Sequence, residues 1–197
     1  MKLLAGVLIA LALAPGTDDE VVQRVHARIA GDDVVAATCS DVVGNGAERG
    51  VTRFRFQYEI EGARRAASGR YTGKVTFSLG EVTITMPKSI AWRQMTDDDR
   101  ERAEALRRAI YHHEVGHVRV AEAVRDELNA RAALAAPDPF AFRSAADAVG
   151  REGFARFTDE QRDYDALTDH GRKQHLAPGL LAGPDTSIRC VTHERRS

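Results

Sequence analysis

The sequence predicts an α+β fold, in which a small antiparallel sheet is followed by a long helix and further helices. Two observations carry this prediction. Apolar and polar residues alternate along much of residues 51–92, which is the pattern of half-buried strands. Between residues 96 and 134 there is no proline and only one glycine, and apolar residues recur at spacings of three and four, as on one face of a helix.

The alternating segments predict three strands, over residues 54–60, 75–79 and 82–86. A turn at Gly80 separates the last two, and residues 62–69, rich in Ala, Arg and Ser, are predicted as a loop. Pro87 ends the third strand or places it at a sheet edge. Before the sheet, Glu20 to Ala30 carries apolar residues at near-helical spacing and predicts a short helix, with an irregular strand as the alternative.

Local signals mark the ends of the helices. Thr96 followed by three aspartates is a favourable helix start, because the acids lie at the positive end of the helix dipole. Later signals are a helix start at Asp138-Pro139, interruptions at Gly150 and Gly153, a capping box of Thr158 and Gln161 that starts a further short helix, and a helix stop at Gly171.

The N-terminus predicts export. Met1-Lys2 precedes an apolar run that ends at Ala14 and has small residues near its end. The run is shorter than the roughly 20 residues that span a bilayer, so we predict a signal peptide over residues 1–16, with an uncleaved anchor as the alternative. The mature chain, residues 17–197, is then one periplasmic or secreted domain without stable membrane insertion. It has a strand-rich part (17–92), a helical catalytic part (93–172) and an irregular tail (173–197).

The net charge bears on the class of binding partner, and the number of cysteines bears on whether a disulfide forms. A formal net charge of −1 provides no basis for a nucleic-acid partner. The two cysteines are Cys39 and Cys190. Export and an even count favour a disulfide between them, and two separate buried thiols are the alternative.

Residues 113–117 read His-Glu-Val-Gly-His, an H-E-x-x-H pattern. On a helix, positions i and i+4 lie one turn apart on the same face, so His113 and His117 can bind one Zn²⁺. Glu114 projects beside them and can act as general base towards a metal-bound water. Two buried structural histidines are the alternative. A buried pair would need several hydrogen-bond partners, however, and a metal satisfies both rings at once.

A catalytic zinc normally has three protein ligands, so a third must be found. The best candidate is His170, which lies at a predicted helix end beside a glycine. Its alternative role is a positive side chain placed at a helix C-terminus. Rival ligands are Asp165, Asp169, Glu160 and Glu152. Tyr164 is a candidate donor to a developing oxyanion, with packing on the helix as its alternative.

Two blocks of the sequence carry a family resemblance: the His-Glu-Val-Gly-His helix, and the later block Tyr164-Asp165-x-x-Thr168-x-His170-Gly171. With the signal peptide and the strand-rich first half, they resemble a bacterial family of predicted secreted zinc-dependent proteases, a domain of unknown function. The resemblance covers most of the mature chain. It implies a minimal zincin-like fold, His113 and His117 as ligands, Glu114 as base and His170 as third ligand.

The expected function is hydrolysis of peptide bonds by an exported zinc metallopeptidase, with a peptide or protein as substrate. An edge strand beside the metal-binding helix would hold the peptide in extended form, and residues 82–86 are the candidate. The alternative is a zinc-binding module of the cell envelope without enzymatic activity. Structural zinc sites are usually closed by four protein ligands, whereas a catalytic site keeps one position open.

Overall fold

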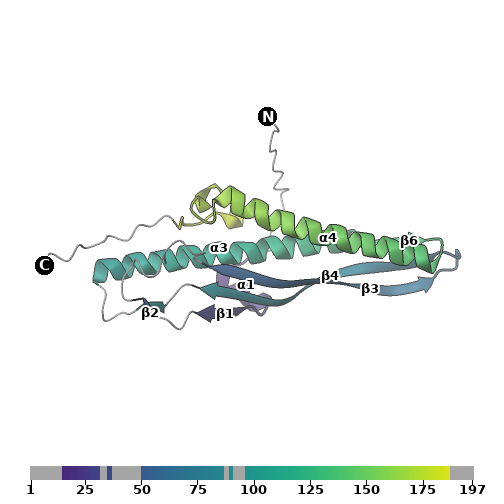
Figure 1. Ribbon diagram of the computed structural model, residues 1–197, viewed down its shortest axis with the longest axis horizontal. Helices are drawn as coiled ribbons and strands as arrows, with labels where there is room; N and C mark the ends of the chain where they lie inside the picture. Colours follow the sequence, from purple (N-terminus) through teal and green to yellow (C-terminus); the bar gives the residue numbers. More distant parts are fainter. Residues whose placement is uncertain (1–14, 32–34, 37–49, 87–88, 91–95, 187–197) are drawn as a thin grey trace, which may run out of the picture. The chain divides into compact units, whose positions relative to one another are not determined.

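The computed structural model describes residues 15–31, 35–36, 50–86, 89–90 and 96–186 (Figure 1). The fold is α+β, as predicted. Most of the predicted signal peptide, Cys39 and Cys190 lie outside the described residues. The elements are α1 (Asp18–Arg24), β1 (Arg28–Gly31), β2 (Val35–Ala36), β3 (Val51–Arg65), β4 (Tyr71–Met86), β5 (Ser89–Ile90), α3 (Asp97–Ala130), β6 (Ala133–Ala136), α4 (Pro139–Thr168), η1 (Gln174–Leu176) and η2 (Gly179–Leu181).

The predicted domain contains two compact units. Among the described residues, the first comprises residues 54–80 and 119–163, and the second comprises residues 15–53, 81–118 and 164–186. Each long element, β3, β4, α3 and α4, therefore contributes residues to both units. Within the described residues, no helix is both long enough and apolar enough to cross a membrane.

In the first unit, the helical segments pack against the β3–β4 hairpin (Figure 1). Its core is a cluster of buried aromatic and aliphatic side chains around Phe56 and Phe77, whose rings stack 5.7 Å apart. Phe157 of α4 stacks on Phe56 at 4.4 Å, and Leu128 of α3 packs against the same cluster. The amide of Asn129 holds the α3 segment to β4, because it donates to the carbonyl of Phe77 and accepts from its N–H.

The expected interruption of α4 was wrong. The helix runs from Pro139 to Thr168 without a break, and Asp138 caps its start as predicted. Gly150 and Gly153 lie where the rings of Tyr58 and Phe77 approach the helix so closely that a Cβ would overlap them. Thr158 bonds the carbonyl of Phe154 inside the helix and starts no new one. The glycines therefore make room for aromatic rings of the hairpin.

The expected turn at Gly80 was also wrong, since β4 is one strand from Tyr71 to Met86. A Cβ at Gly80 would meet the backbone oxygen of Arg55 at 3.1 Å, so the glycine permits close approach between strands. Likewise β3 extends to Arg65, and the chain turns only between Ala66 and Arg70. The predicted loop over residues 62–69 is therefore shorter than expected, and Gly62 lies within the strand with a φ of 64°.

The second unit begins with α1, which has a capping box between Thr17 and Glu20. The helix predicted over residues 20–30 is shorter than expected, because β1 follows it and pairs in parallel with β4 over residues 83–86. The main sheet has the order β1-β4-β3, with β6 antiparallel to β4. It is mixed and not purely antiparallel. Residues 82–86 therefore do not form an edge strand, because β4 lies between β1 and β3.

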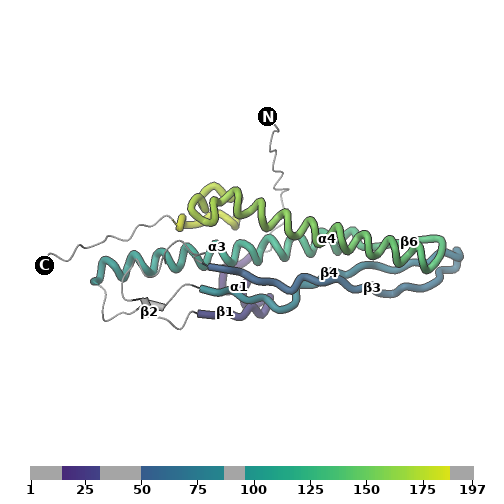
Figure 2. The backbone as a smooth tube through the Cα atoms, viewed as in Figure 1, coloured from purple at the N-terminus to yellow at the C-terminus, as the bar shows by residue number. Residues whose placement is uncertain are grey.

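The chain reverses after α4 through a short left-handed segment. Asp169, His170 and Gly171 have φ values of 48°, 52° and 81°, so the helix stops where Gly171 predicted. The following segment, with η1 and η2, folds back beside α3 (Figure 2). Its Gly183 lies against His112, and Thr186 lies beside Gly171. This return of the chain places the segment after α4 beside the H-E-x-x-H segment of α3.

Candidate metal centre

The predicted H-E-x-x-H segment lies in the middle of α3. The helix starts as expected, with the Thr96 hydroxyl accepting from the N–H of Asp99. The stripe that contains His113 and His117 is apolar elsewhere and includes Leu106, Ile110, Val120 and Val124, all buried. His113 is 5% exposed and Glu114 is 4% exposed. The helix therefore directs both imidazoles and the carboxylate into the protein, as the periodicity predicted.

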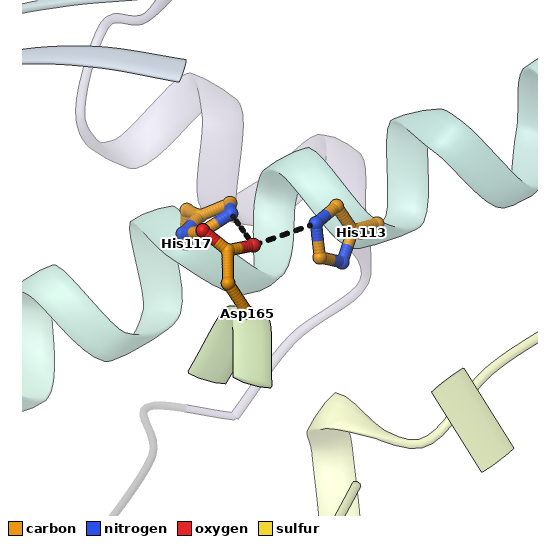
Figure 3. A group of neighbouring side chains, drawn as sticks. All are labelled: His113, His117 and Asp165. Atoms are coloured by element: carbon orange, nitrogen blue, oxygen red, sulfur yellow. Dashed lines mark ion pairs between the residues drawn. The ribbon is translucent and has the colours of Figure 1, made fainter. Parts of the chain in front are cut away.

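Asp165 completes a group of three potential ligands. Its Oδ1 lies 3.3 Å from Nε2 of His113 and 3.2 Å from Nε2 of His117 (Figure 3). One ligand atom from each residue lies within 4.8 Å of the others, and the structure places no other group of this kind among its described residues. The aspartate comes from the last turns of α4, so two helices supply the three side chains.

His170, the residue expected as third ligand, lies at the margin of this group. Its Nδ1 is 3.5 Å from the same Oδ1 of Asp165, and its side chain is 74% exposed. It does not belong to the group of mutually close ligand atoms. The left-handed backbone at His170 is uncommon for a residue with a Cβ. It keeps the imidazole within reach of Asp165 without bringing it between His113 and His117.

The remaining rival ligands have other partners. Asp169 lies near Arg172 and Lys173, at 3.7 and 4.0 Å. Glu160 faces Arg156 in the first unit, and Glu152 is exposed. Within the described structure, none of the three joins the group around His113 and His117.

Tyr164 is fully buried behind the two histidines. Its ring stacks on His113 with centroids 5.1 Å apart and meets His117 edge-on at 4.9 Å. Its hydroxyl donates to the carbonyl of His113 and accepts from the side chain of Gln174. Burial raises the pKa of the phenol, and the nearby carboxylates of Glu114 and Asp165 act in the same direction, whereas the hydrogen bond from Gln174 lowers it. The hydroxyl already has both partners, which favours a supporting role over the expected oxyanion contact.

Sequence reasoning missed Gln174. This residue of η1 is fully buried, and its Oε1 lies 3.0 Å from Nδ1 of His113. No periodicity or motif marks it, because it is a single glutamine in a Gly- and Pro-containing tail. Its position three residues after the Tyr164–Gly171 block is the one sequence feature that could have pointed to it. A residue so close to the block can contact the same side chains as the block does.

Glu114 is held by the start of β3. Thr52 places its hydroxyl 2.7 Å from Oε2 and 3.1 Å from the backbone oxygen of Glu114. Gly50 lies so close that a Cβ there would meet Oε1 at 2.7 Å. Burial raises the pKa of Glu114, although His117, the Thr52 hydroxyl and His113 act in the opposite direction. A buried carboxyl with a raised pKa beside two imidazoles is suited to accept and release a proton.

The ionised form of Asp165 is favoured. Burial by itself would raise its pKa, but the contacts to His113 and His117 outweigh burial and hold the pKa well below its usual range. Asp165 therefore offers an anionic oxygen at neutral pH as a potential metal ligand. Together with two imidazole nitrogens it forms a donor set that suits a divalent cation such as zinc.

These features define an α+β protein with an H-E-x-x-H helix and a carboxylate brought to it from a second helix. The chain belongs to a bacterial family of proteins of unknown function (DUF922), whose match covers residues 37–171, more than half of the 197 residues. Neither the comparison with curated proteins nor that with solved structures finds a match. The family match includes the H-E-x-x-H segment and ends at Gly171.

Proposed function

We propose that this protein is an exported zinc-dependent peptidase whose metal is held by His113, His117 and Asp165. One observation carries the proposal. A carboxylate oxygen of Asp165 lies 3.2–3.3 Å from both Nε2 atoms of an H-E-x-x-H pair that is buried in the helix α3. The predicted signal peptide supports a substrate in the periplasm or outside the cell.

The spacing of these atoms suits zinc. In a tetrahedral site with metal–ligand distances of about 2.0–2.1 Å, neighbouring ligand atoms are about 3.3 Å apart. The separations between the Asp165 oxygen and the two imidazole nitrogens have this magnitude. Two histidines and one carboxylate are a ligand set of catalytic zinc, which leaves one position open for water or substrate. We therefore favour Asp165 over His170 as third ligand.

Glu114 has the position of a general base. It lies next to His113 on α3, and Thr52 holds one of its carboxylate oxygens. A bound zinc ion would supply Lewis acidity, polarising the scissile carbonyl and acidifying a water molecule. Glu114 would then take the proton from that water and deliver it to the leaving amine. Tyr164 would keep the imidazole of His113 in place by stacking, with no direct part in the reaction.

The substrate contact expected at residues 82–86 is better assigned to β3. In the part of the chain that the structure describes, β3 pairs only with β4, so its other edge has no strand partner. Its first residues, Val51 to Arg53, include Thr52 beside Glu114. An extended peptide that paired with this edge would bring its backbone carbonyls near Glu114, which favours a peptide as substrate.

A second function, a zinc-binding module without activity, is supported by His170. Its Nδ1 lies 3.5 Å from the oxygen of Asp165. A rotation of this exposed side chain could add a fourth protein ligand and close the coordination sphere. A site closed in this way would be structural.

The test is turnover of a peptide library by the mature chain, residues 17–197. The wild type should cleave peptides, lose activity with a chelator and regain it with zinc. Glu114→Gln should keep full zinc stoichiometry while cleavage falls by about 10²–10⁴-fold, because the amide cannot accept the proton. Zinc binding without any cleavage would favour the inactive module. Normal cleavage by Glu114→Gln would contradict the proposed base.

A further inference from the structure

We propose that Gln174 is a positioning residue that fixes which nitrogen of His113 is free to bind the metal. The inference rests on the proposed zinc site and extends it to a residue outside the ligand set. Gln174 is fully buried, and its amide makes three contacts at once, to His113, Tyr164 and Leu181. The chemistry of the other two partners determines which end of the amide faces His113.

The amide nitrogen of Gln174 can face only one way. Its Nε2 lies 2.5 Å from the backbone oxygen of Leu181, a carbonyl that can only accept. It also lies 2.8 Å from the hydroxyl of Tyr164, and that hydroxyl gives its own hydrogen to the carbonyl of His113. Both contacts require a donor from Gln174. The NH₂ group therefore points to Leu181 and Tyr164, and the oxygen Oε1 points to His113.

The oxygen of Gln174 in turn determines the proton of His113. An amide oxygen only accepts, so Nδ1 of His113, 3.0 Å away, must carry the hydrogen. In the neutral ring, the lone pair is then on Nε2, the atom that faces Asp165 at 3.3 Å. A metal-binding imidazole needs this arrangement, in which one nitrogen coordinates and the other donates to an acceptor that orients the ring and raises its basicity.

The segment after α4 holds the amide of Gln174 against His113. Gln174 lies on η1 and Leu181 on η2, so two short turns hold the amide against α3. Gly171 permits the approach, because a Cβ there would meet the ring carbon Cγ of His113 at 3.1 Å. The segment after α4 therefore acts on the metal site through Gln174, although it supplies no member of the proposed ligand set.

Two substitutions separate a positioning role from a structural one. Gln174→Met and Gln174→Glu have similar length, and both remove the NH₂ donor to Leu181. Only Gln174→Glu keeps an oxygen for Nδ1 of His113. Zinc affinity is measured by competition with a chelator. We expect Gln174→Met to bind zinc about 10–100-fold more weakly than the wild type, as is typical for loss of such a partner, and Gln174→Glu to bind at least as tightly as the wild type.

Nitrogen-15 NMR of the zinc-loaded wild type gives a readout that does not depend on the variants folding. His113 should coordinate through Nε2, with a slowly exchanging hydrogen on Nδ1. Equal zinc affinity of the two variants, or coordination through Nδ1 in the wild type, would overturn the role of Gln174 and leave the zinc site intact. A wild-type chain that binds no zinc would instead contradict the proposed function on which the inference rests.

Discussion

The hydroxyl of Tyr164 lies directly against Gly116, the residue before the second histidine of the H-E-x-x-H segment. A Cβ at position 116 would overlap the hydroxyl and the adjoining ring carbon. The tyrosine is fully buried and also stacks on His113, so it has little freedom to move away. The glycine in this motif therefore gives Tyr164 the space in which it supports both imidazoles.

This contact predicts that Gly116→Ala destabilises the protein. Alanine is favoured over glycine in a helix by about 1 kcal/mol, but overpacking a filled core costs about 1–3 kcal/mol or more. The overlap with a buried ring should outweigh the gain in helix propensity, so the free energy of unfolding in urea should fall by about 1–2 kcal/mol. Adding Tyr164→Phe should recover part of the loss, because the hydroxyl is the nearest atom. Full additivity of the two changes would argue against direct contact.

The third ligand can be identified by zinc titration. Asp165→Asn preserves shape but removes the anionic oxygen. It should weaken zinc binding by more than about 100-fold, which exceeds the usual loss of affinity when only a hydrogen-bond partner of a metal ligand is removed. His170→Ala should change the affinity little, because that imidazole is exposed and outside the ligand group. The reverse ranking would assign the third position to His170 and refute the set proposed here.

The pH dependence of stability of the metal-free protein should reveal Asp165. Its folded-state pKa is lowered, so the unfolded chain binds more protons in acid, and the stability from Asp165 is lost as pH falls below its ordinary value of 3.8. Asp165→Asn should therefore flatten the decline in unfolding free energy between about pH 5 and 2.5. An unchanged slope would show that the carboxylate is not stabilised by the imidazoles.

Glu114 should change the pH dependence of stability in the direction opposite to Asp165. Burial raises its folded-state pKa above 4.5, so the stability from its protonated form is present at low pH and is lost as pH rises through the raised value. Glu114→Gln should remove this loss, so the variant should gain stability relative to the wild type as pH increases from about 4 to 7. Denaturation curves of the metal-free proteins across this range provide the measurement, and a constant difference would contradict the raised pKa.

The uninterrupted helix α4 can be tested at Gly153. Gly153→Ala should destabilise the protein by about 1–3 kcal/mol in spite of its better helix propensity, because the new methyl group overlaps the ring of Phe77. Phe77→Leu in the same chain should reduce that cost, since a shorter side chain leaves space beside the helix. If Gly153 interrupted the helix instead, alanine there would stabilise the protein with or without Phe77.

Local sequence signals were sufficient for much of the fold. The period-two alternation predicted the hairpin strands, and the apolar stripe with its Thr96 cap predicted α3. These elements depend on neighbours within one or two turns, so the pattern is visible in the chain itself. The same periodicity predicted that His113 and His117 point inward from one face, and the structure confirms this orientation.

The glycines were ambiguous in the sequence, because a glycine can mark a backbone that only glycine adopts or a place where a Cβ has no room. Gly171 is of the first kind, with a positive φ, and it ended α4 as predicted. Gly80, Gly150 and Gly153 are of the second kind, although the local sequence predicts a break at each of them. Only the positions of Arg55, Tyr58 and Phe77 in space separate the two cases.

The sequence by itself determined that this chain forms an α+β fold with an H-E-x-x-H helix, because periodicity, caps and motif spacing are properties of neighbouring residues. The tertiary structure alone decided that Asp165 lies between the histidines, that His170 stays at the margin and that Gln174 faces Nδ1 of His113. The contacts of Asp165 and Gln174 with the two histidines join residues 48 to 61 positions apart. The Asp165 contacts depend on how the last turns of α4 lie against α3, and the Gln174 contact depends also on the left-handed turn after α4. No pattern of neighbouring residues encodes either approach.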